Sequence, residues 1–188
     1  GTSVDATLAA VECADYVIAV VNKYVPRAFG QAMIHSSKID FFVQDDTPLI
    51  EAKFSEPNEV ETAIGKHCAA LIEDGATLQM GIGAIPNAVL AQLGGHRNLG
   101  IHTEMFADGV LPLVRKGVIN GEAKKTDPGK MVSTFLMGSQ RVYDFIDDNP
   151  AVLMMDVGYT NDPYIISKND RVTAINSALQ VDITGQVC

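Results

Sequence analysis

The sequence has no tryptophan, only 6% aromatic residues and three cysteines among its 188 residues. The cysteines are far apart and include no C-x-x-C pair: Cys13, Cys68 and Cys188. Such spacing argues against a disulfide framework and against a thiolate metal site, so we expect a reducing compartment and a cytoplasmic location. The histidines His35, His67 and His96 lack the spacing of metal ligands, and we expect no metal site.

Basic residues are scarce as well, with 14 Lys and Arg against 23 Asp and Glu and a net charge of −9. A field of this sign repels polyanions, which argues against nucleic acid or an anionic membrane as a partner. No apolar run approaches the roughly 20 residues of a membrane span, and nothing resembles a signal peptide. A small phosphorylated ligand is still compatible with the sequence, because backbone amides bind phosphate locally.

The hydrophobic fraction of 47% is enough for one well-filled core, or for one domain with part of another. The first part of the chain predicts a helix over 4–14, a short strand over 15–22, and loops with strand pairs over 24–46. A polar stretch containing Pro57 precedes a clear helix, so we place a domain boundary near Ser55. Because the chain opens on a helix cap and stops directly after a strand, we expect a segment of a longer protein.

After this boundary, helical and strand patterns alternate along the chain. Helices are expected over 58–74, 86–94, 109–118, 140–149 and 163–169, and strands over 77–83, 99–104, 131–138, 151–158 and 171–182. Strands separated by helical crossovers predict an α/β fold with a mostly parallel sheet and helices on both faces. The continuous apolar character of the strands agrees with a sheet that is covered on both sides.

Two of these strands end in residues suited to chemistry, Gly81 to Gly83 after one and Glu104 after the next. The carboxyl ends of parallel strands meet at one edge of a sheet, where ligands bind. In a dinucleotide site the glycines would face pyrophosphate and Glu104 a ribose, although the third glycine of that pattern is missing. Alternatively, the glycines form only a tight turn and Glu104 is a solvated strand end. In a third interpretation Glu104 attacks a thioester and the glycine amides stabilise the oxyanion. The residues alone leave all three open.

Several other polar residues have both a structural and a functional interpretation. His102 could orient Glu104 from the same strand face, although packing is the simpler interpretation. Asn87 could line the crevice or serve as a polar residue at a helix start. The pair Asn149-Pro150 predicts a turn, and Cys68 lies on the apolar face of its helix and is expected in the core.

Four ordered motifs resemble one known family: "LQMGIGAIPNAVLAQL", "LGIHTEMFADGVLPLVRKGVING", "FLMGSQRVYDFIDDNP" and "INSALQVDITGQV". Together with "VNKYVPRAFGQAMIHSSKID" they extend the resemblance over nearly the whole chain. The family is that of acetyl-CoA hydrolases and transferases, and the resemblance is closest to its 4-hydroxybutyrate and butyrate:acetate CoA-transferases. Four motifs in order are far more specific than any single glycine pattern.

The resemblance implies a class I CoA-transferase-like protein of two α/β domains, with 1–55 the tail of the first and 56–188 the front of the second, catalytic one. Glu104 matches the nucleophile that forms a glutamyl–CoA thioester, so coenzyme A is a substrate and no resident cofactor is implied. The positions that match CoA contacts are Gln79, Gly81, Ile82, Gly83, Ala84, Ile85 and Asn176. The implied partners are an acyl-CoA, a short-chain carboxylic acid such as acetate, butyrate or 4-hydroxybutyrate, and further copies of the full-length protein. An acetyl-CoA hydrolase, or a nucleotide-binding module without a covalent step, is the alternative.

Overall fold

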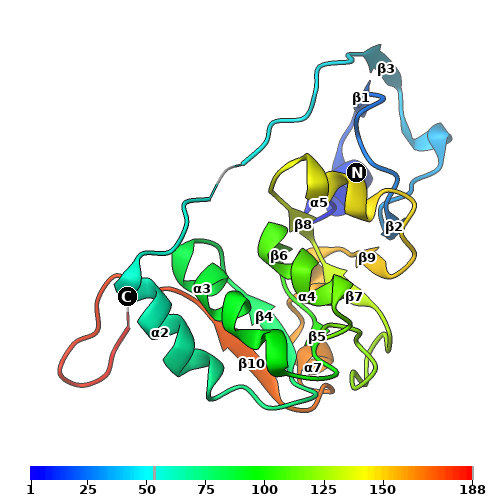
Figure 1. The fold of residues 1–188 in the computed structure, drawn as a ribbon. Helices are drawn as coiled ribbons and strands as arrows, with labels where there is room; N and C mark the ends of the chain where they lie inside the picture. Colours follow the sequence, from blue (N-terminus) through cyan, green and yellow to red (C-terminus); the bar gives the residue numbers. More distant parts are fainter. Residues whose placement is uncertain (53, 188) are drawn as a thin grey trace.

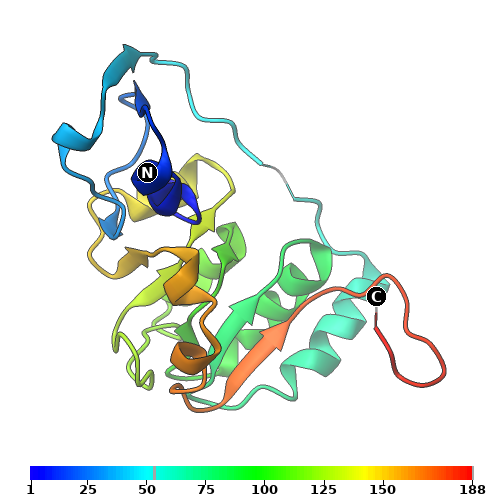
Figure 2. The ribbon, with the colours of Figure 1, turned by 180° about the vertical axis from the view of Figure 1, so that it is seen from behind.

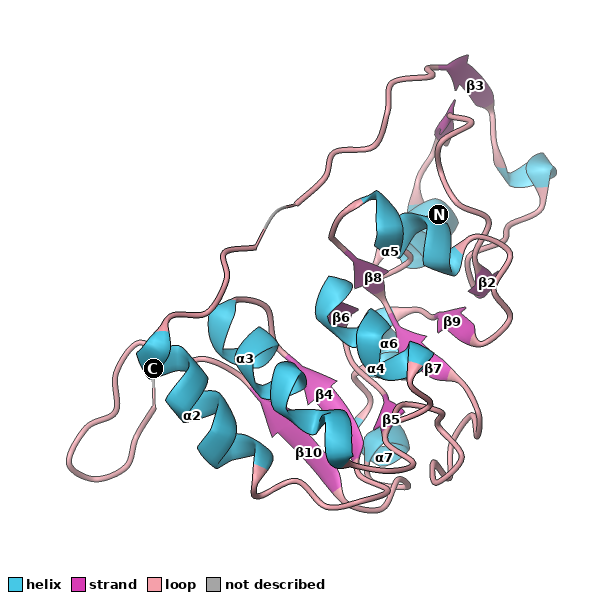
Figure 3. Ribbon diagram, in the orientation of Figure 1, coloured by secondary structure: helices cyan, strands magenta, loops and turns pink. Residues whose placement is uncertain are grey.

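The computed structural model describes residues 1–52 and 54–187, so the expectation for Cys188 lies outside the described residues (Figure 1). The helices are α1 (Thr7–Cys13), α2 (Glu59–Ala69), α3 (Ala84–Gln92), α4 (Leu111–Arg115), α5 (Gln140–Ile146), α6 (Val157–Thr160) and α7 (Pro163–Ile166), with 3₁₀ turns η1 (Ser36–Lys38), η2 (Leu93–Gly95) and η3 (Asp108–Val110). The strands are β1 (Ile18–Val21), β2 (Phe29–Gly30), β3 (Phe41–Gln44), β4 (Thr77–Met80), β5 (Gly100–Ile101), β6 (Met105–Phe106), β7 (Met131–Ser133), β8 (Phe135–Leu136), β9 (Val152–Met154) and β10 (Val172–Ile175) (Figure 3).

The strands pair in short ladders, and each ladder between two of these strands is parallel. The orders are β10-β4-β5, β2-β9-β7, β6-β8 and β1-β3. A bridge between His102 and Val132 joins the end of β5 to β7, so the first two ladders continue into each other. The predicted α/β class with a mostly parallel sheet is confirmed, although its strands are shorter than expected.

Helices cover both faces of the β10-β4-β5 ladder. Helices α2 and α3 lie on one face, and the α6–α7 segment lies on the other, as the two opposite views show (Figures 1 and 2). Alternate residues of β4 point to opposite sides. Leu78 and Met80 belong to the hydrophobic core, whereas Thr77 and Gln79 face a cavity toward α6 and α7. The sheet therefore separates a packed side from a side with open space.

Two predicted strands are interrupted, and the interruptions meet. The strand expected over 99–104 ends at Ile101, and the strand expected over 131–138 breaks at Thr134. The carbonyl oxygen of Glu104 accepts the amides of both Thr134 and Phe135, at 2.9 and 3.1 Å. Both segments of the chain bend at this contact, so a continuous ladder of strand pairs cannot form there. The expected strands were too long because apolar runs carry no signal for such a paired bend.

The expected helix and strand ends also shift elsewhere. Helix α3 begins at Ala84 rather than at Pro86, and helix α5 ends at Ile146. The strand expected over 151–158 stops at Met154, because Asp156 caps α6 through its side chain, which accepts the amide of Gly158 at 2.7 Å. Helix α6 is only four residues long, which is too short for a periodic apolar pattern to predict it.

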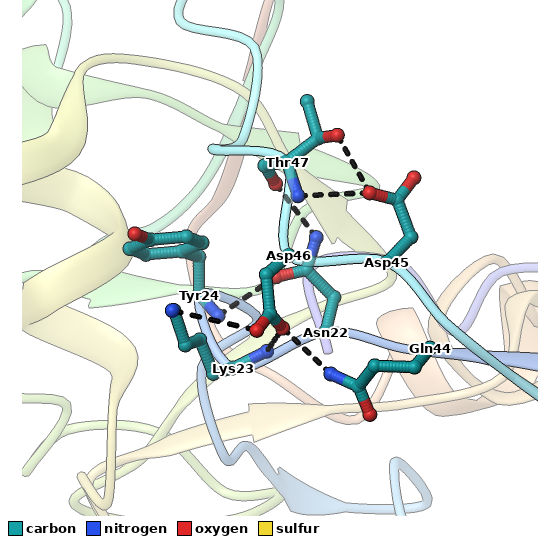
Figure 4. A network of polar contacts seen from close by, with 7 residues as sticks. All are labelled: Asn22, Lys23, Tyr24, Gln44, Asp45, Asp46 and Thr47. Atoms are coloured by element: carbon teal, nitrogen blue, oxygen red, sulfur yellow. Dashed lines mark hydrogen bonds and ion pairs between the residues drawn. The ribbon is translucent and has the colours of Figure 1, made fainter.

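Residues 15–50 form an arm whose β1–β3 pair exposes most of its apolar side chains (Figure 1). Polar contacts join the segments after the two strands (Figure 4). Asn22 donates to the carbonyl of Thr47 at 2.7 Å, and Lys23 forms an ion pair with Asp46 at 3.4 Å. The two segments that follow β1 and β3 are therefore joined to each other by polar contacts.

Contacts cross the predicted boundary near Ser55. Val4 is buried in the core, Ser3 bridges to Phe135, and β2 pairs with β9. The division into a first and a second domain stays a prediction.

After the boundary, Asn58 begins α2 with a capping box, in which its side chain and that of Glu61 accept each other's amides at 2.9 and 2.8 Å. Within the described residues, no helix is long and apolar enough to cross a membrane.

Candidate active site

The glycine turn joins β4 to α3 and depends on one unusual backbone conformation. Gly83, the residue before α3, has φ of 115° and ψ of −173°. Side chains other than hydrogen are essentially excluded from this region, and strained backbone of this kind costs about 1–3 kcal/mol per residue. A Cβ at Gly83 would meet no atom within 4 Å, so glycine is required there for conformation rather than for space.

Gly81 is required for space. A Cβ at this position would lie 2.8 Å from Oδ1 of Asn176 and 3.1 Å from the carbonyl oxygen of Ile175. The Gly81 amide donates to that carbonyl at 2.8 Å, so it is not free to bind an oxyanion, in contrast to the interpretation in which all the glycine amides do. In the described part of the chain, the amides of Ile82 and Gly83 have no acceptor and, like the first amides of α3, are available to a ligand.

Glu104 lies at the bend between β5 and β6, with its side chain exposed and its backbone fixed. Its carbonyl oxygen accepts hydrogen bonds from the amides of Thr134 and Phe135. It also accepts from the hydroxyls of Ser133 and Thr134, at 2.9 and 2.7 Å. The neighbouring Thr103 is buried, and its hydroxyl accepts the amide of Met80 at 3.1 Å. These contacts fix Glu104 against the end of β4, where the glycine turn starts.

The Glu104 carboxylate has one side-chain partner among the described residues, Asn161. Nδ2 of Asn161 donates to Oε2 of Glu104 at 3.2 Å, from the residue that follows α6. This contact leaves the other carboxylate oxygen available. Because α6 has no periodic signal and Asn161 is far from Glu104 in sequence, the sequence did not predict this residue.

His102 does not orient Glu104, since its contacts point elsewhere. The ring is buried, and Nε2 lies 2.8 Å from the carbonyl oxygen of Thr160. Desolvation by burial lowers the pKa of His102, with the hydrogen bond to Thr160 opposing that shift and Lys124 adding to it. A neutral ring that donates from Nε2 leaves Nδ1 as an acceptor, and this atom has no partner within the described residues.

Gln79 and Asn176 are predicted site residues that the fold brings together. Their side-chain amides exchange two hydrogen bonds, at 2.9 and 3.3 Å, although 97 residues separate them. In the parallel register Gln79 of β4 is opposite Ala174 of β10, and Asn176 lies two residues further along, diagonally across from Gln79. Asn176 also packs on Gly81, and a larger residue at 81 would displace it.

Two cavities meet at Gln79 and Glu104, which line both of them. One has about 350 Å³, opens beside Gly81 and Ile82, and also contains Asn176. The other has about 240 Å³ and extends between β4, β10 and the α6–α7 segment. Glu104, Gly81 and Ile82 thus border the same open space, as the nucleophile interpretation requires. Ala84 and Ile85, the two other predicted contacts, form the first turn of α3 and are half-buried.

A larger cavity of about 590 Å³ contains none of the predicted site residues. Asn87 lines it and does not cap α3, because Gly83 occupies the cap position.

Cys68 is partly buried and packs against the core, and Asn149 forms the predicted turn by accepting the amide of Ala151 at 3.0 Å. In the part of the chain that the structure describes, no three His, Cys, Asp or Glu residues cluster as metal ligands would.

A buried lysine supports the strand that leads to Glu104. Nζ of Lys124 donates to the carbonyls of Ile101 and Lys130 at 3.0 and 2.8 Å, behind Gly100. Desolvation by burial lowers the pKa of Lys124 to about 8, although Asp127 opposes the shift. The sequence analysis missed Lys124, because a lysine in a loop is usually solvated.

Several known proteins are similar to this chain in sequence and in fold. A family model described as the acetyl-CoA hydrolase/transferase C-terminal domain matches residues 138–188. The 4-hydroxybutyrate coenzyme A transferase of Clostridium kluyveri is 54% identical over the whole chain, which covers 44% of that protein. The structure of a 4-hydroxybutyrate CoA-transferase from Porphyromonas gingivalis matches all of this chain, which covers 48% of it, with a TM-score of 0.95 and 48% identity.

A further structure, RipA from Yersinia pestis, matches the whole chain with a TM-score of 0.96 and 41% identity, and the chain covers 44% of it. The chain thus spans less than half the length of these relatives. The similarity extends over all of its elements, including the strand ends that carry Gly81 and Glu104. The chain belongs to the acetyl-CoA hydrolase/transferase family.

Proposed function

We propose that the full-length protein is a CoA-transferase that moves CoA between an acyl-CoA and a short-chain carboxylic acid of the acetate, butyrate or 4-hydroxybutyrate type. The observation that carries this proposal is the position of Glu104. Its exposed carboxylate lines the same cavity as the glycine turn, whose Ile82 and Gly83 amides lack acceptors in the described chain. A carboxylate nucleophile opposite free backbone amides is the arrangement that acyl transfer from a thioester requires.

In the first step a Glu104 oxygen attacks the thioester carbon, and the oxyanion that forms meets the amides of Ile82 and Gly83. The C–S bond breaks, CoA leaves as a thiolate, and Glu104 holds the acyl group as a mixed anhydride. The thiolate then attacks the glutamyl carbon, which releases the first carboxylic acid as its carboxylate and leaves a glutamyl–CoA thioester. The incoming carboxylate reverses both steps, so that CoA ends on the second acid and the Glu104 carboxylate is regenerated.

The exchange of substrates through an enzyme-bound CoA gives a direct test. Incubating the full-length protein with butyryl-CoA should add the mass of CoA to the protein, on the peptide that contains Glu104. Borohydride should reduce this thioester to an alcohol and fix the site, which an amide or a noncovalent complex would not allow. A protein mass unchanged by butyryl-CoA, with CoA bound only reversibly, would instead support a nucleotide-binding module.

Asn161 is proposed as a positioning residue for Glu104. Asn161→Ala should lower kcat/KM about tenfold, because it removes a hydrogen bond to an ionised group worth about 1.5–3 kcal/mol. Asn161→Asp should lower it further, and should move the acid limb of the pH profile to higher pH, because a like charge opposes ionisation of Glu104. Equal losses in both variants with an unmoved pH profile would show that Asn161 only supports α6.

The remaining predictions concern the whole protein. Coenzyme A is proposed as a substrate, and the proposed reaction uses the Glu104 carboxylate and backbone amides without a resident cofactor. A cytoplasmic location and a homo-oligomer of the full-length protein are proposals as well. Transfer and hydrolysis differ in whether water reaches the glutamyl–CoA thioester, so release of free CoA without an acceptor acid measures the hydrolase alternative.

A further inference from the structure

The short helix α6 places Asn161 beside Glu104, and contacts outside the helix determine where it lies. Helix α6 is a single turn, and a helix this short is not stable without tertiary contacts. The amide of Asn161 donates to the carbonyl of Val157 at 2.9 Å, so Asn161 follows any movement of the helix. Its side-chain contact with Glu104, at 3.2 Å, is at the long end of the usual range for N–H···O hydrogen bonds. A small displacement of α6 would therefore break this contact.

The start of α6 is held by the first part of the chain. The amide of Val157 donates to the carbonyl of Asp5 at 3.2 Å, and the amide of Asp156 donates to Oε1 of Gln31 at 2.7 Å. These two contacts fix the beginning of the turn. The end of the turn, which directly precedes Asn161, needs contacts of its own.

Two contacts hold the end of α6 against the strand that leads to Glu104. The carbonyl oxygen of Thr160 lies 2.8 Å from Nε2 of His102. The hydroxyl of Tyr159 donates to Oδ2 of Asp127 at 2.7 Å, and the centre of the Tyr159 ring lies 6.2 Å from that of the His102 ring, a separation typical of packed rings. One contact alone would let the helix end rotate about that point, and the second contact prevents this rotation.

Asp127 is a fixed acceptor, because its loop is tied to the same strand. Lys124, three residues earlier, is buried and donates from Nζ to the carbonyl of Ile101 on β5 at 3.0 Å. Within the described residues, the Asp127 carboxylate has Tyr159 as its one hydrogen-bond partner. Burial, this hydrogen bond and the charge of Asp127 raise the pKa of Tyr159 to about 12, so the hydroxyl keeps its proton and donates. The loop thus joins the strand of the proposed nucleophile to the helix that carries its partner.

We propose that Tyr159 is a positioning residue for Glu104: its hydroxyl, held by Asp127, keeps the end of α6 where the Asn161 side chain contacts the Glu104 carboxylate. This inference rests on the proposed transferase function and adds a residue that acts through Asn161. Tyr159 lines neither of the cavities beside Glu104, so its effect on the reaction does not come from contact with a substrate.

The test is a double-mutant cycle on kcat/KM for transfer of CoA from butyryl-CoA to acetate by the full-length enzyme. Tyr159→Phe removes one hydroxyl and keeps the ring, and should lower kcat/KM about fivefold, less than the roughly tenfold loss expected for Asn161→Ala. In the Asn161→Ala background the same change should cost nothing further, because the contact that it maintains is already absent. Losses that multiply in the double variant would overturn the proposal, since Tyr159 would then act independently of Asn161.

A control and the melting temperature separate positioning from general support of the fold. Tyr164→Phe makes the same substitution on α7, at a side chain that is exposed and whose hydroxyl has no partner in the described chain. It should leave kcat/KM unchanged, and a loss equal to that of Tyr159→Phe would contradict the proposal. Tyr159→Phe should lower the melting temperature equally with Asn161 or alanine at 161, whereas its effect on kcat/KM should appear only with Asn161.

A crystal structure separates this proposal from the proposed function, because it requires no turnover. In full-length Tyr159→Phe without substrate, Nδ2 of Asn161 should lie beyond hydrogen-bond distance of the Glu104 carboxylate, whereas the parent protein should retain the contact. An unchanged contact in Tyr159→Phe would overturn the positioning role, whether or not the parent transfers CoA. A contact that is lost in the variant of a protein without transfer activity would support the positioning role and refute the proposed function.

Discussion

Replacing Glu104 by glutamine in the full-length protein is expected to lower kcat for CoA transfer by roughly 10⁴-fold or more, the scale of losing a covalent nucleophile. Glutamine has almost the same size and retains an oxygen that can accept from Asn161, so the site keeps its shape. An uncharged amide cannot displace the thiolate, and neither the anhydride nor the glutamyl–CoA thioester can form. The free amides of Ile82 and Gly83 remain, so binding of CoA should change little.

The measurement is transfer of CoA from butyryl-CoA to acetate, together with the affinity for CoA. Glu122→Gln is a matched control, because it makes the same substitution at an exposed loop residue outside both cavities. Glu104→Gln should lose transfer and the CoA mass adduct, while its melting temperature and CoA affinity stay near those of the parent. Transfer by Glu104→Gln at even a tenth of the parent rate would eliminate a glutamyl intermediate at this position.

The alternation of apolar runs with helical patterns was sufficient to predict the α/β class, because buried parallel strands have a distinctive composition. It was not sufficient for the element ends. Strands β5 and β7 stop where the Glu104 carbonyl takes two amides of the other segment, a contact between residues 30 apart. Helix α6 depends on one capping aspartate, Asp156, rather than on apolar periodicity. Local patterns record burial, whereas these ends depend on tertiary hydrogen bonds.

Some residues of the candidate site could likewise be predicted from the sequence, and others could not. Gly81, Gly83 and Glu104 could be identified because their residue types are informative and the strand order places them at one edge. Asn161 and Lys124 could not, because their roles depend on contacts with distant backbone or side-chain atoms. The amide of Gly81 could not be excluded as a free donor either, since its acceptor, the Ile175 carbonyl, belongs to β10, which pairs with β4 but is distant in sequence.

Replacing Gly65 by leucine is expected to lower the free energy of unfolding by about 2–3 kcal/mol, through packing rather than helix propensity. Gly65 is buried in α2 where this helix crosses α3, and a Cβ there would lie 2.7 Å from the carbonyl carbon of Ala88 and 2.8 Å from its oxygen. Leucine has a helix propensity about 1 kcal/mol better than that of glycine, so propensity alone predicts a gain. The close atoms are the backbone and the Cβ of Ala88, none of which a side-chain rotation can move, so the two helices must separate.

Separation of α2 from α3 should also displace the start of α3 and the glycine turn before it. Ala88 is one turn beyond the start of α3, and the residue before that start is Gly83, whose amide is one of the two proposed oxyanion donors. A shift of about 1 Å at a catalytic group can cost about 10²-fold in rate, so Gly65→Leu should lower kcat in parallel with stability. Ala63→Leu, on an exposed position of α2, adds the larger side chain without this contact and should change neither quantity. If Gly65→Leu is as stable as Ala63→Leu, then α2 does not hold the glycine turn, and the position of the Ile82 and Gly83 amides must be fixed by β4 alone.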